Sequence, residues 1–156
     1  TAKVGKLTRA QAEEIAKTAT AETPDVTRRL ISMLVRIYYS RPSISRIMMS
    51  EIGRENSIVR ERFVKRYGSR AMQSLKRIFG SLIENGVYDR RIDTDHAALV
   101  LLSVLNAPII ITKPIRPSGR PICPGVDEPE TERWIDFLTD MFDRQFISQR
   151  RSSTGN

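Results

Sequence analysis

Residues 57–95 read SIVRERFVKRYGSRAMQSLKRIFGSLIENGVYDRRIDTD, and this stretch decides the fold. Its apolar residues recur at steps of three and four, which places them on one side of an α-helix. They are Val59, Phe63, Tyr67, Ala71, Leu75, Phe79 and Leu82. Arginine and lysine occupy many of the positions between them and form a solvated opposite face. The pattern lasts for about eight turns, so we predict one long helix against which shorter helices pack.

The ends of this helix have recognisable signals. We predict that it ends at Asn85-Gly86, because glycine adopts the left-handed backbone conformation of a helix C-terminus at little steric cost. Asp93 and Asp95 are predicted to begin the next helix, since a carboxylate accepts hydrogen bonds from the first free N–H groups.

The rest of the chain also has helical patterns, bounded by proline, glycine or capping residues such as Thr8. Further helices are predicted over residues 7–23, 25–39, 43–53, 95–107 and 130–149. We find no alternating strand pattern and no internal repeat. The sequence therefore predicts an all-α fold with about six helices, in which residues 1–150 form one domain and residues 151–156 a disordered tail.

Composition is typical of a soluble globular protein, with 40% hydrophobic and 28% charged residues among 156. The single Cys123 excludes an internal disulfide and favours a reducing compartment. No signal peptide opens the chain. The longest uncharged run, residues 97–112, is shorter than the ~20 residues of a membrane-spanning helix. We expect a cytoplasmic protein with no membrane partner.

Catalytic and metal-binding motifs are not found in the sequence. His96 could be grouped with Asp93, Asp95 and Cys123 as a ligand set, but the spacing differs from the i,i+4 repeat of helical metal motifs. We interpret His96 as a neighbour of a helix cap. Cys123 has no sequence-adjacent base that would activate it as a nucleophile. The sequence predicts no enzyme, no catalytic or metal-ligating residue and no cofactor.

Two packing features point to binding. Several adaptable side chains are predicted on converging faces, where they either fill the core or line an apolar ligand pocket: Met33, Tyr38, Met48, Met49, Phe63, Tyr67 and Met72. The last two predicted helices carry more apolar surface than a small monomer covers easily. Two such helices from each of two copies would bury that surface as a four-helix bundle, so we predict a homodimer.

Three stretches carry a resemblance to a known family. The first is Arg41-Pro42 with Ile44, Ile47 and Glu51. The second is LIENGVY at residues 82–88, which runs on to Asp93, and the third is Ala97-Ala98-Leu99. Together with the order of the predicted helices, they resemble the C-terminal ligand-binding and dimerisation domain of TetR-family transcriptional regulators.

The resemblance implies a bacterial repressor that a small apolar effector releases from operator DNA. Family members open with a helix-turn-helix unit, and nothing in residues 1–24 resembles it. We therefore expect the DNA-binding unit upstream of this chain, or a derived protein without it, and name no DNA-binding residue. The helix over residues 7–23 would connect the sensing domain to the DNA-binding units.

Site residues follow from the predicted helix faces under that resemblance. The ligand-binding residues would be Leu30, Met33, Ile37, Ile47, Phe63, Tyr67, Leu101 and Leu105. The dimer interface would be formed by Leu99, Leu102, Trp134, Phe137, Leu138 and Met141.

Net charge leaves an alternative open. The chain carries a formal charge of +8 and has a pI near 10.1, which admits an anionic partner. Its basic residues are spread along helix faces and are not interleaved with aromatic residues for base stacking. The alternative function is a free-standing basic helical module that binds nucleic acid or an acidic protein through the arginine-rich face of the long helix.

Overall fold

The computed structural model describes residues 8–40, 58–110 and 128–147, and all regular secondary structure in these ranges is helical. The elements are α1 (Arg9–Thr18), α2 (Val26–Tyr39), α4 (Ile58–Phe63), the π-helical turn η1 (Val64–Gly68), α5 (Ser69–Glu84), α6 (Thr94–Ile110) and α7 (Glu128–Phe146). The prediction of an all-α fold is confirmed for this part of the chain. The helix expected over residues 43–53 and the tail expected over residues 151–156 lie outside the described residues.

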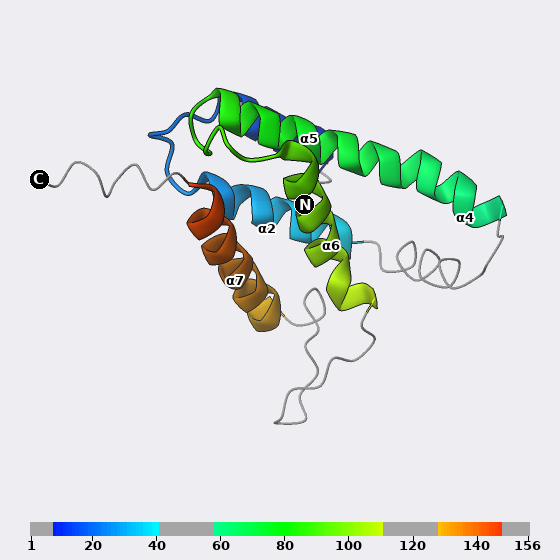
Figure 1. The fold of residues 1–156 in the computed structure, drawn as a ribbon. Helices are drawn as coiled ribbons and strands as arrows, with labels where there is room; N and C mark the ends of the chain where they lie inside the picture. Colours follow the sequence, from blue (N-terminus) through cyan, green and yellow to red (C-terminus); the bar gives the residue numbers. More distant parts are fainter. Residues whose placement is uncertain (1–7, 41–57, 111–127, 148–156) are drawn as a thin grey trace, which may run out of the picture.

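The predicted long helix is present as a continuous rod formed by α4, η1 and α5 (Figure 1). At about 1.5 Å per residue it is about 40 Å long. Gly68 has right-handed helical backbone angles, so α5 continues directly from η1 without a new cap. The rod ends as predicted, because Gly86 follows it with a φ of +74°.

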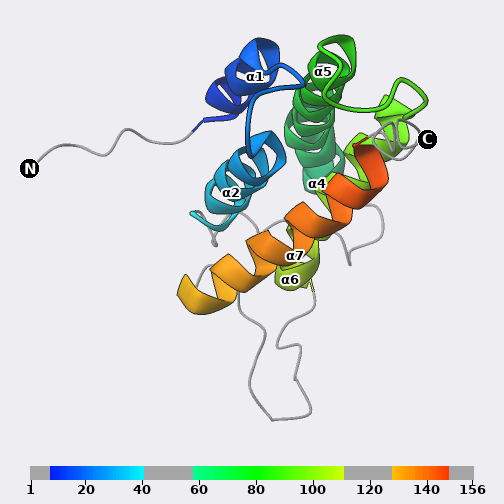
Figure 2. The same ribbon diagram turned by 90° about the vertical axis from the view of Figure 1, so that its left-hand side faces the viewer.

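The other helices pack along the α5 half of this rod. α1 lies beside α5, and α2, α6 and α7 lie beneath this pair (Figures 1 and 2). α2 is central, because it contacts α1, α6 and α7. Among the described elements, α4 extends away from the other helices, as Figure 1 shows.

Buried side chains from every packed helix form one core. Four aromatic rings join α5 and the loop after it to the end of α7: Phe79, Tyr88, Phe142 and Phe146. The Tyr88 hydroxyl shares a buried hydrogen bond of 2.8 Å with the Thr27 hydroxyl of α2. The loop is also held by its backbone, where the Asp89 N–H donates to the Phe146 carbonyl at 2.9 Å.

α1 begins at Arg9, directly after the predicted cap Thr8, and ends earlier than predicted. The Thr8 hydroxyl accepts from the Gln11 N–H at 3.3 Å, and the Gln11 side chain accepts from the Thr8 N–H at 2.8 Å. The helix stops at Thr18 instead of Thr23, since residues 20–23 form a turn in which the Thr20 N–H donates to the Thr23 hydroxyl. The side-chain amide of Asn85 satisfies the freed carbonyls of Ala16 and Lys17 at 3.1 and 3.0 Å.

The last two helices have slightly different bounds from those predicted. α6 continues past the expected end at Ala107 to Ile110 and includes Pro108. Pro108 has no N–H to donate to the carbonyl four residues earlier, and the helix ends two residues after it. α7 starts at Glu128 with Pro129 in its first turn, a position that suits proline. No described helix is long and apolar enough to cross a membrane.

Candidate effector pocket and dimer face

The residues expected to bind an effector fall into three groups. Leu30 on α2 and Leu101 and Leu105 on α6 are buried in the core. Met33 is half-buried and packs against that core, and Ile37 is half-buried further along α2. α2 and α6 are in contact, but these residues fill or border the packed core, so the pocket between them stays a prediction.

One predicted pocket residue is placed differently. Tyr67 belongs to η1, and 42% of its surface is exposed. It lies outside the core cluster that contains Leu30 and Leu105. Ile47 and the side chain of Phe63 lie outside what the structure describes.

Tyr39 links the two helices of the predicted pocket. Its hydroxyl donates to the Leu105 carbonyl at 3.0 Å, which joins α2 to α6. Burial raises the pKa of Tyr39.

A hollow of about 660 Å³ opens between the start of α6, the loop before it and the end of α7. Its lining residues are Asp89, Arg91, Ile92, Asp93, His96, Ala97, Val100, Gln145 and Phe146. Asp93 accepts from the backbone N–H groups of Asp95 and His96 at 2.9 and 3.1 Å. These bonds, with the one from His96 largest, lower the pKa of Asp93.

The roles of Asp93 and His96 agree with the sequence interpretation. Asp93 caps α6, and the exposed His96 ring lies 3.5 Å from its carboxylate. Within residues 8–40, 58–110 and 128–147, no group of three or more His, Cys, Asp or Glu is placed to hold a metal ion. Cys123 lies outside the described residues.

The predicted dimer residues lie at different depths in the protomer. Phe137 and Leu99 are exposed, at 60% and 53%. Leu102, Trp134 and Met141 are half-buried against the core. Leu138 is fully buried, since it shares the inward stripe of α7 with residues 135 and 142.

Sequence reasoning missed Val100, which is 47% exposed beside Leu99 on α6. The helix is apolar on nearly all sides, so its sequence carries no periodic signal for which residues face outward. On α7 the Phe137 ring stacks on Trp134 with centroids 6.1 Å apart. The exposed Phe137 ring therefore lies against a Trp134 side chain that is half-buried at the core.

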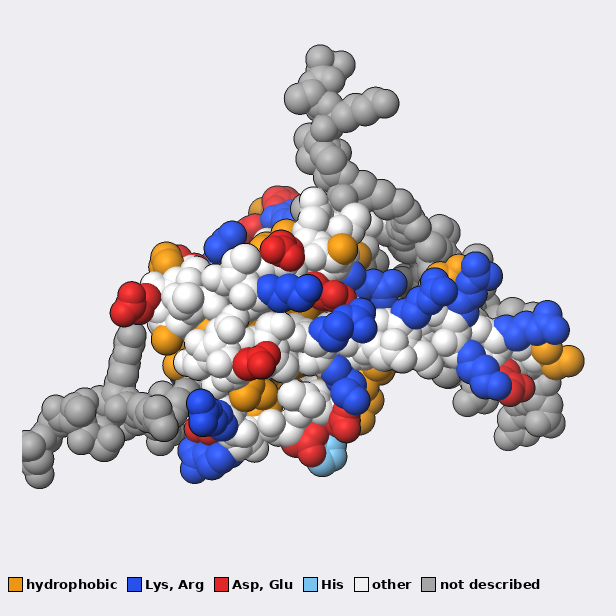
Figure 3. Space-filling model, turned by 90° about the horizontal axis from the view of Figure 1, so that it is seen from above, with side chains coloured by type: hydrophobic (Ala, Val, Ile, Leu, Met, Phe, Trp, Pro, Cys, Tyr) orange, Lys and Arg blue, Asp and Glu red, His pale blue; other side chains and the backbone are white. Residues whose placement is uncertain are grey.

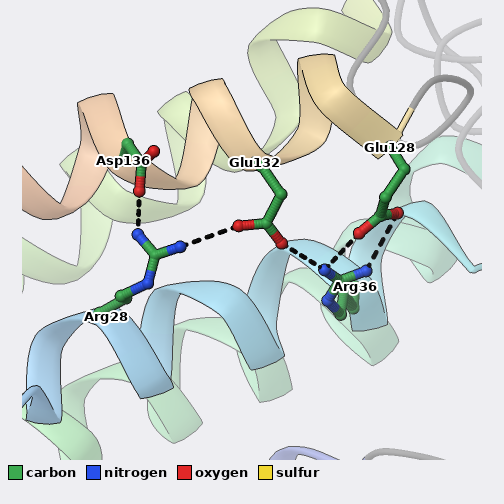
Figure 4. A network of polar contacts seen from close by, with 5 residues as sticks. All are labelled: Arg28, Arg36, Glu128, Glu132 and Asp136. Atoms are coloured by element: carbon green, nitrogen blue, oxygen red, sulfur yellow. Dashed lines mark hydrogen bonds and ion pairs between the residues drawn. The ribbon is translucent and has the colours of Figure 1, made fainter.

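Ion pairs connect α2 to α7 (Figure 4). We call this set of residues the seam: Arg28 and Arg36 of α2, and Glu128, Glu132 and Asp136 of α7. Glu132 bridges both arginines at 2.8 Å. Arg36 also reaches Glu128 at 2.6 Å, and Arg28 reaches Asp136. The hydrogen bond between Arg36 and Glu128 lowers the pKa of Glu128 and raises the pKa of Arg36.

The spacing explains how the seam forms. Its acids recur every four residues along α7 and so lie on one side of that helix, while its arginines are two turns apart on α2. The arginine nearer the start of α2 meets the acids further along α7, so the two helices run in opposite directions.

No protein-family model, curated protein or solved structure matches this chain. The resemblance to TetR-family domains therefore rests on the motifs and helix order.

Proposed function

We propose that this chain is the effector-sensing and dimerisation domain of a TetR-like DNA-binding transcriptional regulator, a repressor released by a small apolar ligand. One observation carries the proposal. Each of the last two helices buries one side in the core, while Leu99 and Val100 on α6 and Phe137 on α7 stay exposed. Exposed large apolar side chains on both helices would form a protein–protein interface if a partner covered them together.

A second copy of the chain is the proposed partner for these residues. α6 and α7 from each protomer would form a four-helix bundle, in which the same surface of both copies is buried about a two-fold axis. Phe137, stacked on Trp134, is suited to anchor such an interface, because aromatic residues contribute disproportionately to binding.

α2 is the element that would connect effector to dimer. It contacts α6, with which it forms the predicted pocket, and it is tied to α7 by the seam. A ligand between α2 and α6 would shift α2, and the seam would transmit this shift to the dimer helix. The ligand would thereby favour one dimer geometry over another.

α1 would pass the change on to DNA-binding units outside this chain. It is fixed to α5 through Glu13, which accepts from Arg77 at 3.0 Å and from Ser74 at 2.6 Å. Two operator half-sites lie about 34–36 Å apart, so a change in the angle between the two α1 helices of a dimer would break the match. No catalytic residue, metal or cofactor is assigned in this proposal.

Binding of an apolar probe tests the sensing part. We expect anilinonaphthalene sulfonate to bind saturably, with about one site per protomer. Met33→Gln should weaken that binding at least about fivefold, because it places an amide beside the proposed pocket. Met72→Gln is the matched control, since Met72 is also a half-buried methionine packed against the core, but on α5. Equal loss in both variants, or no saturable binding, would contradict the proposed pocket.

A further inference from the structure

Half of the net charge of this chain is concentrated in residues 58–70. These 13 positions contain five basic residues and one acid, a net charge of +4 out of +8. They form α4, η1 and the start of α5, the end of the rod that extends away from the other helices (Figure 1). Figure 3 shows Lys and Arg side chains gathered along this part of the surface.

Three arginines in this segment have no carboxylate partner within the part of the chain that the structure describes. Arg62, Arg66 and Arg70 are exposed, and none of them forms an ion pair there. Closer to the core the pattern differs, because Lys76 pairs with Asp95 at 2.6 Å and Arg77 with Glu13 at 3.0 Å. The exposed arginines keep their charge available for a partner.

The π-helical turn brings these three arginines closer to one line. Residues four apart on an α-helix are turned by about 40° from one another, so a row with this spacing drifts around the axis. A π turn takes one extra residue and reverses part of that drift. η1 lies between Arg62 and Arg70, so the row of arginines drifts less around the rod than it would on a regular α-helix.

We propose that Arg62, Arg66 and Arg70 form a basic stripe that binds the phosphate backbone of duplex DNA; Lys65 beside them is paired with Glu61 at 3.3 Å. The row is about 12 Å long at ~1.5 Å per residue. Phosphates of one DNA strand advance by about 3.4 Å along the duplex axis, so the stripe spans three to four of them. Contacts of this kind position a protein on DNA and carry no sequence information.

The shape of the stripe favours a duplex over other anions. A free phosphate or nucleotide needs donors that converge on one point, whereas these guanidinium groups are spread along a convex rod (Figure 3). A lipid surface needs apolar side chains that insert between the cations. Among the side chains described on α4 and η1, only Ile58 and Tyr67 are exposed and apolar, and Arg66 lies over the Tyr67 ring at 6.0 Å.

The proposal that this stripe binds DNA is independent of the proposed regulatory function. The DNA-binding stripe and the regulatory function are compatible. Glu13 contacts residues 74 and 77 and Ala16 contacts residue 85, so α1 runs in the same direction as α5. The first residues of α1 therefore lie toward the stripe. A DNA-binding unit ahead of α1 would enter from that side. The stripe would then contact DNA that flanks the operator.

Fluorescence anisotropy with a labelled 20-base-pair duplex of arbitrary sequence tests the stripe in the chain as it is. The test variant is R62Q/R66Q/R70Q. Its matched control is K17Q/R29Q/R90Q, which removes the same charge from exposed positions that form no ion pair among the described residues. Circular dichroism establishes that both variants remain helical.

We expect the unaltered chain to bind the duplex with an affinity that falls steeply between about 50 mM and about 200 mM salt. The stripe variant should bind at least about tenfold more weakly at the lower salt. For the stripe variant, the plot of the logarithm of the binding constant against the logarithm of the salt concentration should have a slope that is shallower by about 2.7. Each lost phosphate contact accounts for about 0.9 of this difference, and three arginines are replaced. The control should stay within about twofold.

Three results would overturn the stripe as a DNA contact. They are no duplex binding by the unaltered chain, equal weakening in both variants, and a stripe variant that binds duplex normally but no longer binds phosphatidylserine-containing vesicles. None of these results changes the oligomeric state, so the failure of this inference is distinguishable from failure of the proposed dimer.

Discussion

Gly86 ends α5 in a left-handed backbone conformation that other residues adopt only at a cost. Its φ is +74°, and no atom lies within 4 Å of where a Cβ would stand. Gly86→Ala should therefore lower the free energy of unfolding by about 1 kcal/mol through the backbone alone.

Gly80 is the matched control inside the same helix. A Cβ at this position would also have no atom within 4 Å, but the backbone here is helical. Gly80→Ala should raise the free energy of unfolding by about 0.5–1 kcal/mol, because alanine favours the helix. Urea denaturation of both variants measures the difference, and the same sign of change in both would contradict the assignment of the helix end.

Glu13 gives the α1–α5 contact a pH dependence. The hydrogen bond from Arg77 lowers the pKa of Glu13 below its ordinary value of 4.5. A lowered carboxyl pKa stabilises the folded protein fully above that ordinary value, and the contribution is lost as the pH falls through the lowered pKa.

Glu13→Gln should therefore cost about 1 kcal/mol at neutral pH and progressively less below pH 4.5. The control is Glu14→Gln, at an exposed neighbour that has no ion pair within the described ranges. Urea denaturation along a pH series measures both. A cost for Glu13→Gln that does not shrink in acid would contradict this role.

Individual residues show which parts of the fold the sequence predicts well. Thr8, Gly86 and Asp93 act at helix ends through local geometry, and all three do what the sequence predicts. Partners far apart in the chain give no local signal. Glu132 meets Arg28 and Arg36 across 104 and 96 residues, and nothing in the pattern of either helix pairs them.

At the scale of elements, the seam between α2 and α7 is the contact that sequence reasoning missed. Glu132→Gln removes its charge from both arginines. Since the seam residues are at least one-third exposed, we expect a loss of only about 1 kcal/mol at about 0.05 M salt and almost none at about 1 M.

Urea denaturation at the two salt concentrations measures this loss. Glu84→Gln serves as the control, because Glu84 is exposed at the end of α5 and forms no ion pair among the described residues. A loss that is independent of salt would mean that Glu132 acts by packing and not by charge.

The long rod contains a π turn that its sequence pattern does not predict. Its apolar residues from Val59 to Phe79 recur at steps of four, a spacing that drifts around a regular α-helix by about 40° per step. The π-helical turn η1 turns by less per residue than an α-helix and so reverses part of this drift. The sequence pattern predicts the length of the rod, but it does not locate the π turn, and Tyr67 within that turn is exposed and not in the core.

At the scale of the whole molecule, the central proposal is that two copies associate through α6 and α7. The test variant is L99E/F137E, which places a charge at one exposed apolar residue of each helix. The matched control is I58E/I147E, which makes the same change at exposed apolar residues outside them. Both variants alter only surface positions, so we expect both to remain folded.

The most direct measurement is the molar mass in solution by light scattering at micromolar concentration. We predict twice the chain mass of 17.8 kDa for the unaltered protein and the control, and the mass of a single chain for L99E/F137E. An unaltered protein with the mass of one chain, or a dimer that L99E/F137E leaves intact, would contradict the proposed interface.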